Sequence, residues 1–256
     1  SLIVIMAVKT VERNYSLSKH TFQLEVSPNK LFTPNMTTKL FSKAVRINPG
    51  DIVFDIGYGV GVLAIWAALE PSISVIGVEK VEEQYELAKR NAQKTKVDNK
   101  IKFYHGSLFD PIPKGTKANV IIADVSGIAD NLARVMSTNG EKWYPQNIPT
   151  GGFDGTEVIN SMLEQAGEYL APGGRLYFPV ASLSSYKKII DPDKKSGVAF
   201  SKFSNLEAKI NATFPLEHGQ RELIEKVGVP GTYEIFTRRS RNIWLGWIYE
   251  ASNPIS

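Results

Sequence analysis

Apolar and polar positions alternate along the middle of the chain in a pattern that predicts strands and helices in turn. Short apolar runs that end in a polar residue are typical of buried strands, whereas apolar residues at every third or fourth position are typical of helices. The expected strands cover residues 51–55, 74–78, 101–105, 119–123 and 175–180, and the expected helices cover residues 35–45, 61–69, 81–96 and 156–170. Asn35 is the expected N-cap of the first helix, which has Met36, Leu40, Phe41 and Ala44 on one face. Such alternation predicts βαβ units and a doubly wound, mostly parallel sheet of the Rossmann-like α/β class.

The two ends of the chain follow other patterns. Residues 1–34, with expected strands at 3–8 and 21–26, precede a proline-bearing turn and are predicted to form an N-terminal extension or cover. Residues 35–256 are predicted to form one domain, in which the lysine-rich stretch 182–203 is expected to be a helix end and a flexible loop. Further strands are expected near residues 206–214, 233–237 and 242–251.

The apolar stretch at residues 2–8 does not indicate a membrane segment. It is far too short to span a bilayer, and it lacks the basic leader and the small-residue cleavage site of a signal peptide. We therefore expect a soluble, cytoplasmic protein with no membrane partner.

The composition excludes several kinds of functional site. The chain has no cysteine, which excludes a disulfide scaffold, a thiol nucleophile and a cysteine-ligated metal. Three scattered histidines leave little for a metal site or a catalytic triad, so no metal is predicted. The net charge of +4 is mild. The basic run 238–241, with Trp244 and Trp247 after it, leaves a nucleic-acid partner open, although a charged hairpin turn is the favoured interpretation.

The stretch Asp55-Ile-Gly57-Tyr58-Gly59-Val-Gly61 has the pattern of a buried strand, a tight turn and a helix N-terminus. It is not a P-loop, because no Gly-Lys-Ser/Thr follows it. A dinucleotide loop would have its third glycine three positions after the second, and here the spacing is two. An acid at the strand end is also a poor neighbour for a pyrophosphate.

The acids at two strand ends favour a cationic ligand without phosphates. S-adenosylmethionine has a sulfonium, an amino group and ribose hydroxyls. Asp55 is expected to bind its amino end, and Glu79, at the end of the next strand, is expected to accept both ribose hydroxyls. The alternative for Glu79 is a solvated acid at a helix start.

These features resemble the class I S-adenosylmethionine-dependent methyltransferases. The loop 55–61, Glu79, the loop 106–110 and the turn 170–176 carry the resemblance, which spans about residues 35–180. It implies a seven-stranded sheet whose last strand is antiparallel, with the cofactor across the carboxyl ends of the first strands. Ser107 stands where the family often has an acid that contacts the adenine. The cofactor contacts that the resemblance implies are Thr37, Thr38, Asp55, Gly57, Tyr58, Gly59, Gly61, Glu79, Lys80, Ser107, Leu108 and Asp124.

The acceptor side is less defined. The segment 150–155, Thr-Gly-Gly-Phe-Asp-Gly, is similar to the release-factor glutamine methyltransferases, but their Asn-Pro-Pro-Tyr is replaced by residues 124–127, Asp-Val-Ser-Gly. The stretch 61–65 and the pair Thr37-Thr38 resemble the ribosomal-protein lysine methyltransferases.

Asp124 is the candidate catalytic residue, since it could accept a proton from an amine or orient the nitrogen; it could also only cap the next segment. The aromatic residues of the irregular stretch that follows, Trp143, Tyr144 and Phe153, could line an acceptor pocket or pack under a loop.

The sequence thus predicts an S-adenosylmethionine-dependent methyltransferase that acts on a nitrogen, or less readily an oxygen, of a protein side chain or a small molecule. The alternatives are a non-catalytic cofactor-binding module, suggested by the missing Pro-Pro-Tyr, and an RNA methyltransferase, suggested by the basic run. The acceptor and the oligomeric state stay open.

Overall fold

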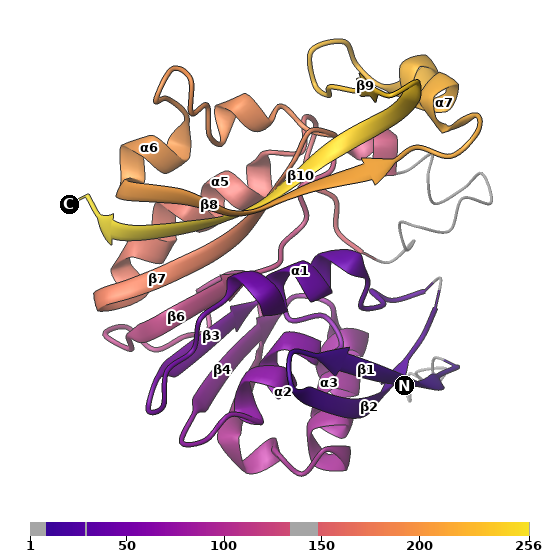
Figure 1. The fold of residues 1–256 in the computed structure, drawn as a ribbon. Coiled ribbons are helices and arrows are strands. Elements are labelled where there is room, and N and C mark those ends of the chain that lie inside the picture. Colours follow the sequence, from indigo (N-terminus) through magenta and orange to yellow (C-terminus); the bar gives the residue numbers. More distant parts are fainter. Residues whose placement is uncertain (1–8, 29, 134–147, 256) are drawn as a thin grey trace, which may run out of the picture.

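The computed structural model describes residues 9–28, 30–133 and 148–255, and its centre is one twisted sheet (Figure 1). The strands of this sheet are β3 (Ile52–Ile56), β4 (Ser74–Glu79), β5 (Ile101–His105), β6 (Ala118–Ala123), β7 (Leu170–Ala181), β8 (Phe203–Pro215), β9 (Phe236–Arg238) and β10 (Arg241–Pro254). Their order is β5-β4-β3-β6-β7-β10-β8, with β9 paired to β10. Neighbours from β5 to β7 are parallel, and β10 runs antiparallel to both β7 and β8. The mostly parallel sheet with an antiparallel last strand is confirmed, but the short β9 makes it eight-stranded instead of seven-stranded.

Helices cover both faces of the sheet. The α-helices are α1 (Met36–Ala44), α2 (Val62–Ala68), α3 (Glu82–Lys94), α5 (Glu157–Ala166), α6 (Val198–Lys202) and α7 (Gln220–Val227). The central strands supply side chains to two cores, so that Val53 packs with α1, α2 and α3 while Phe54 packs with α5 and α6. Strands buried on both faces are continuously apolar, which is why the pattern of β3 and β6 was visible in the sequence.

The first helix confirms the predicted N-cap. Asn35 accepts a hydrogen bond from the Thr37 N–H at 2.9 Å, and the Thr38 hydroxyl accepts one from the Asn35 N–H at 3.3 Å. Of the four apolar residues expected on one face of this helix, Phe41 is buried. Met36, at the other end of that face, is 57% exposed.

The N-terminal extension is a hairpin with its own small sheet, formed by β1 (Val11–Leu17) and β2 (His20–Val26). The predicted strand at 3–8 lies outside the described residues, and β1 was not predicted because most of its side chains are exposed. Asn91 of α3 accepts a hydrogen bond from the Glu25 N–H at 2.8 Å. Its amide also donates to the carbonyl oxygens of Glu25 and Val60, at 3.0 and 2.9 Å. The hairpin is therefore tied to α3 and to the glycine loop, while the boundary between residues 34 and 35 stays a prediction.

The C-terminal part differs from its prediction in several places. Helix α7 was not predicted, and the strand expected at 233–237 is only the short β9. The stretch 182–203 is not the expected loop, because Ile189, Ile190 and Ala199 are buried in the second core. The charged hairpin turn is confirmed: β9 and β10 are joined by Arg239 and Ser240, both with positive φ, as in a two-residue turn. Among the described residues, no helix is long and apolar enough to cross a membrane.

Candidate functional site

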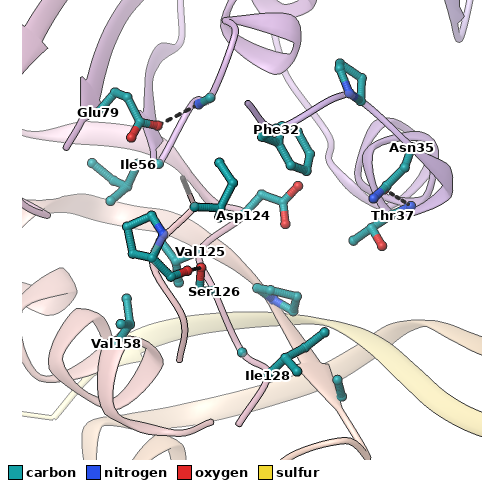
Figure 2. A pocket seen from close by; sticks show the side chains of 18 of the residues that line it. Phe32, Asn35, Thr37, Ile56, Glu79, Asp124, Val125, Ser126, Ile128 and Val158 are labelled. Carbon is teal, nitrogen blue, oxygen red and sulfur yellow. Dashed lines mark hydrogen bonds between the residues drawn. The ribbon is translucent and has the colours of Figure 1, made fainter. Parts of the chain in front are cut away.

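A cavity of about 880 Å³ lies at the carboxyl ends of the parallel strands (Figure 2). Its lining comes from the ends of β3, β4 and β6, from β7, β8 and β10, and from residues 28–40 that cross above them. We call the part around Gly57, Gly59 and Glu79 the glycine-loop end, and the part around Phe214 and Trp244 the aromatic end. In open α/β sheets ligands bind at this edge.

The glycine loop has a backbone that other residues would strain. Gly57, Gly59 and Gly61 have φ values of +76°, +56° and +89°. A Cβ on Gly59 would lie 2.8 Å from the Phe32 ring, and one on Gly61 would lie 3.1 Å from the Ala88 side chain. The glycines therefore permit both the turn and the close packing of the elements around it.

Glu79 is held rigidly at the end of β4. The side chain is only 5% exposed, so it is not the solvated acid of the alternative interpretation. One carboxylate oxygen accepts a hydrogen bond from the Gly59 N–H and the other from the Val81 N–H, each at 2.8 Å. Burial raises the pKa of Glu79, while these N–H groups oppose the shift. A carboxylate has about four lone-pair sites, and these two N–H groups take one on each oxygen.

Two more acids lie near Glu79. Asp55 is fully buried, and neither of its oxygens has a hydrogen bond of ordinary geometry among the described residues. Burial raises the pKa of Asp55 well above its usual range, and the neighbouring charge of Asp124 raises it further. Burial also raises the pKa of Asp124 to about 7. Figure 2 shows the Asp124 carboxylate pointing into the cavity, where a cation would relieve this crowding of negative charge.

The segment before α1 closes over the glycine loop. The Phe32 N–H donates to Gln84 of α3 at 2.9 Å, and Gln84 is buried and also hydrogen-bonded to Glu79. The Thr33 hydroxyl lines the cavity and has no hydrogen-bond partner among the described residues. Gln84 thus links the extension to the acid at the end of β4.

The structure brings most of the predicted site residues together. Those that line the cavity are Thr37, Gly57, Gly59, Glu79, Lys80, Ser107, Leu108 and Asp124. The others, Thr38, Asp55, Tyr58 and Gly61, lie outside its lining. Thr38 caps α1, Tyr58 packs against Phe103 with ring centroids 4.9 Å apart, and Gly61 is the left-handed N-cap of α2.

The segment 151–155 supports the loop after β6. The Gly151 N–H donates to the Ile128 carbonyl at 3.0 Å, and a Cβ on Gly155 would lie 2.8 Å from the Ala129 nitrogen. Asp154 accepts from the Thr156 hydroxyl at 2.6 Å and pairs with Lys188 at 2.5 Å. The segment therefore joins the loop that carries Asp124 to the start of α5.

The aromatic end is built by residues that were not predicted for that role. Phe214 and Trp244 stack with centroids 4.1 Å apart. Of the aromatic residues proposed for an acceptor pocket, Trp143 and Tyr144 lie outside the described residues, and Phe153 is 58% exposed and outside the cavity lining. Phe32 and Gln84 were also missed, since a single aromatic or amide in a chain carries no pattern.

The chain matches known proteins as follows. The family model described as "Methyltransferase domain" matches residues 47–195. The release factor glutamine methyltransferase of Aliivibrio fischeri is 31% identical over 156 residues, which is 60% of this chain and 54% of that protein. The protein of the same name from Vibrio cholerae is 31% identical over 160 residues, with the same coverage. The chain spans about half the length of these curated relatives.

Solved structures support the fold alone. A 16S rRNA N2 methyltransferase of T. thermophilus, in complex with AdoMet and guanosine, has a TM-score of 0.60 at 11% identity and covers 95% of this chain and 50% of that chain. A ribosomal protein methylase of Lactobacillus delbrueckii subsp. bulgaricus has a TM-score of 0.52 at 16% identity, with 89% and 84% covered. The predicted resemblance to class I methyltransferases is thereby confirmed.

The described residues fit the predicted cofactor. Gly57 and Gly59 have no side chain between their backbone and the cavity, and the buried hydroxyl of Thr33 lacks a hydrogen-bond partner among the described residues. Acids with raised pKa values favour a positive ligand over a phosphate. The arrangement suits a cationic sulfonium compound with free hydroxyls.

Proposed function

Since the chain belongs to the methyltransferase domain family and S-adenosylmethionine is its cofactor, we propose that it is an N-methyltransferase whose acceptor is an amine. The observation that carries the proposal is Asp124, an acid at the end of β6 that points into the cavity where the relatives' motif has an amide.

Glu79 and the glycine loop form the cofactor site in this proposal. The Glu79 oxygens, oriented by the Gly59 and Val81 N–H groups, accept the ribose hydroxyls. Asp124 and Glu79, which both line the cavity, provide negative charge for the positive end. Ser107 and Leu108, on the loop after β5, contact the adenine. When bound, the cofactor would supply an electrophilic methyl carbon, whose bond to sulfur breaks as S-adenosylhomocysteine leaves. The chain's task is to align the acceptor with that carbon.

Asp124 selects the acceptor. An ionised carboxylate only accepts hydrogen bonds, so it matches an amine, which offers donors. A glutamine amide also presents a carbonyl oxygen, which an asparagine side chain can satisfy and an ionised aspartate cannot. Asp124 accepts a hydrogen bond from the attacking nitrogen and takes up the proton that this nitrogen loses when its bond to carbon forms. A carboxyl pKa of about 7 suits this transfer near neutral pH.

The test uses Asp124→Asn, which restores the relatives' residue at the start of the motif. With labelled S-adenosylmethionine and a panel of primary amines, transfer by the variant should fall by roughly a hundredfold or more, as expected when a general base is lost. Asp110→Asn, at an exposed acid on the loop after β5, is the matched control and should keep the wild-type rate.

The pH profile gives a second readout. Because Asp124 must be ionised to accept a proton, transfer should rise with pH through about 7 in the wild type. A variant that gains activity on a glutamine peptide and loses none on amines would refute the proposal in favour of amide methylation. Cofactor binding with no transfer to any acceptor would favour a non-catalytic module.

A further inference from the structure

The aromatic end of the cavity contains a built surface that the cofactor site does not use. Phe214 of β8 and Trp244 of β10 are opposite each other in the sheet and stack at an interplanar angle of 14°. Both rings are half-buried and both line the cavity. The stack leaves an outer ring face and ring edges as an apolar surface, which we call the aromatic platform, in the same cavity as Asp124.

A glycine keeps this platform in place. Gly246 lies two residues after Trp244, on the same face of β10. A Cβ there would lie 2.8 Å from the Phe214 ring and 3.5 Å from the Trp244 ring. Its neighbour on β7 is the small Ala181, so no large side chain lies beside the platform there. Met36 and Leu40 of α1 line the same cavity.

The platform is separated from Asp124 by a fixed part of the sheet. The strand register places Asp124 level with Ile248 of β10, so Trp244 lies two strands across and four residues further along. At ordinary strand geometry the two backbones are roughly 16 Å apart, and both side chains line the cavity between them. A ring on the platform and a nitrogen at Asp124 must therefore be joined by a spacer of several bonds.

Packing alone does not explain the arrangement. Trp244 does contact a small core with Leu183 and Ile224, which accounts for the buried half of the ring. That core does not include Phe214. The basic run 238–241 lies on the hairpin next to Trp244 but outside the cavity lining, whose basic side chains among the described residues are Arg13, on β1, and Lys80, directly after β4.

We propose that the Phe214–Trp244 platform binds a planar aromatic ring of the acceptor, so that the acceptor is a small arylalkylamine with its nitrogen at Asp124. This inference rests on the proposed function, since it assigns the substrate class of the same site. Stacked aromatic pairs are stabilised beyond simple burial, which makes ring recognition selective against an aliphatic chain.

Binding calorimetry on the full chain, saturated with S-adenosylhomocysteine, tests the platform without requiring turnover. The probes are tryptamine and hexylamine, which share an ammonium group and differ in the ring. Tryptamine should bind roughly tenfold more tightly than hexylamine, as expected for an aromatic contact. In Trp244→Leu and in Phe214→Leu this preference should disappear, whereas Trp244→Phe should keep part of it.

Controls separate the failure of the platform from failure of the fold or of the proposed function. Phe153→Leu changes an exposed aromatic outside the cavity lining and should keep the tryptamine preference. Unchanged affinity for S-adenosylhomocysteine shows that a variant is folded. Equal binding of the two probes by the wild type, or an equal loss of both in Trp244→Leu, overturns the platform. Methyl transfer, measured separately, reports on the proposed function.

Discussion

The glycine-loop end and the aromatic end of the cavity are built in different ways. At the glycine-loop end, backbone groups and short-range contacts between residues 55 and 108 set the geometry, as in the hydrogen bonds that orient Glu79. At the aromatic end, side chains from β7, β8 and β10 meet only because β10 inserts between β7 and β8. In the two proposals, donor binding depends mainly on the loops that follow β3, β4 and β5, whereas recognition of the acceptor's ring depends on the strand order. We therefore expect a substitution at one end to change the affinity for S-adenosylhomocysteine or for the acceptor, but not both.

The largest effect on binding should come from Glu79→Gln. The carboxylate accepts from Gly59 and Val81, and an amide would turn a donor toward one of these N–H groups. Hydrogen bonds to a charged group contribute about 1.5–3 kcal/mol, so the affinity for S-adenosylhomocysteine should fall by roughly 10- to 100-fold. Calorimetry measures this, with Glu82→Gln at the exposed start of α3 as the control. An unchanged affinity would remove Glu79 from the cofactor site.

What the sequence could predict follows the same division. The strand ends at Asp55 and Glu79 were predicted because a buried parallel strand leaves an apolar run that stops at an acid. The N-cap at Asn35 was predicted because capping depends on neighbours within one turn. Phe214 and Trp244, thirty positions apart in the chain, could not be paired without the register between β8 and β10.

Two further predictions show where the sequence pattern was insufficient. The stretch 182–203 is polar in composition. Its few buried apolar residues, such as Ile189 and Ile190, do not recur at the spacing of a helix or a strand. The predicted cofactor contact at Tyr58 followed the family's loop, but in this chain the ring packs against Phe103. A contact between the Tyr58 backbone and the cofactor stays a prediction.

Gln84→Ala should produce a smaller loss at the glycine-loop end. It removes the acceptor of the Phe32 N–H and a hydrogen bond to Glu79, so the cover over Gly59 is less well held. Loss of such hydrogen bonds is worth about 1 kcal/mol each, so cofactor affinity should fall by roughly fivefold or more. Gln93→Ala, an exposed residue of the same helix, is the control. Equal effects of the two variants would mean that the extension does not contribute to cofactor binding.

Gly246→Ala should act at the aromatic end alone. The added methyl group would meet the Phe214 ring at 2.8 Å and displace it from the platform. We expect tryptamine affinity to fall by roughly five- to tenfold, about the value of an aromatic contact, with no change for S-adenosylhomocysteine. Calorimetry with both ligands on one preparation provides the internal control. A parallel loss of both affinities would show that the two ends are not independent.

The smallest expected effect is a shift in the pH dependence of stability caused by Asp124. Burial raises its pKa in the folded protein to about 7, from about 3.9 in an unfolded chain. Between these values the folded state retains a proton that the unfolded state has released, so the free energy of unfolding decreases as pH rises. Asp124→Asn cannot titrate, and its Tm should therefore fall less than that of the wild type between about pH 5 and about pH 8. Thermal unfolding measured by circular dichroism across this range checks the difference. Parallel Tm curves would mean that Asp124 is solvated in the free protein. Asp124 would then lack the burial that raises its pKa, and proton transfer to it near neutral pH would not be explained.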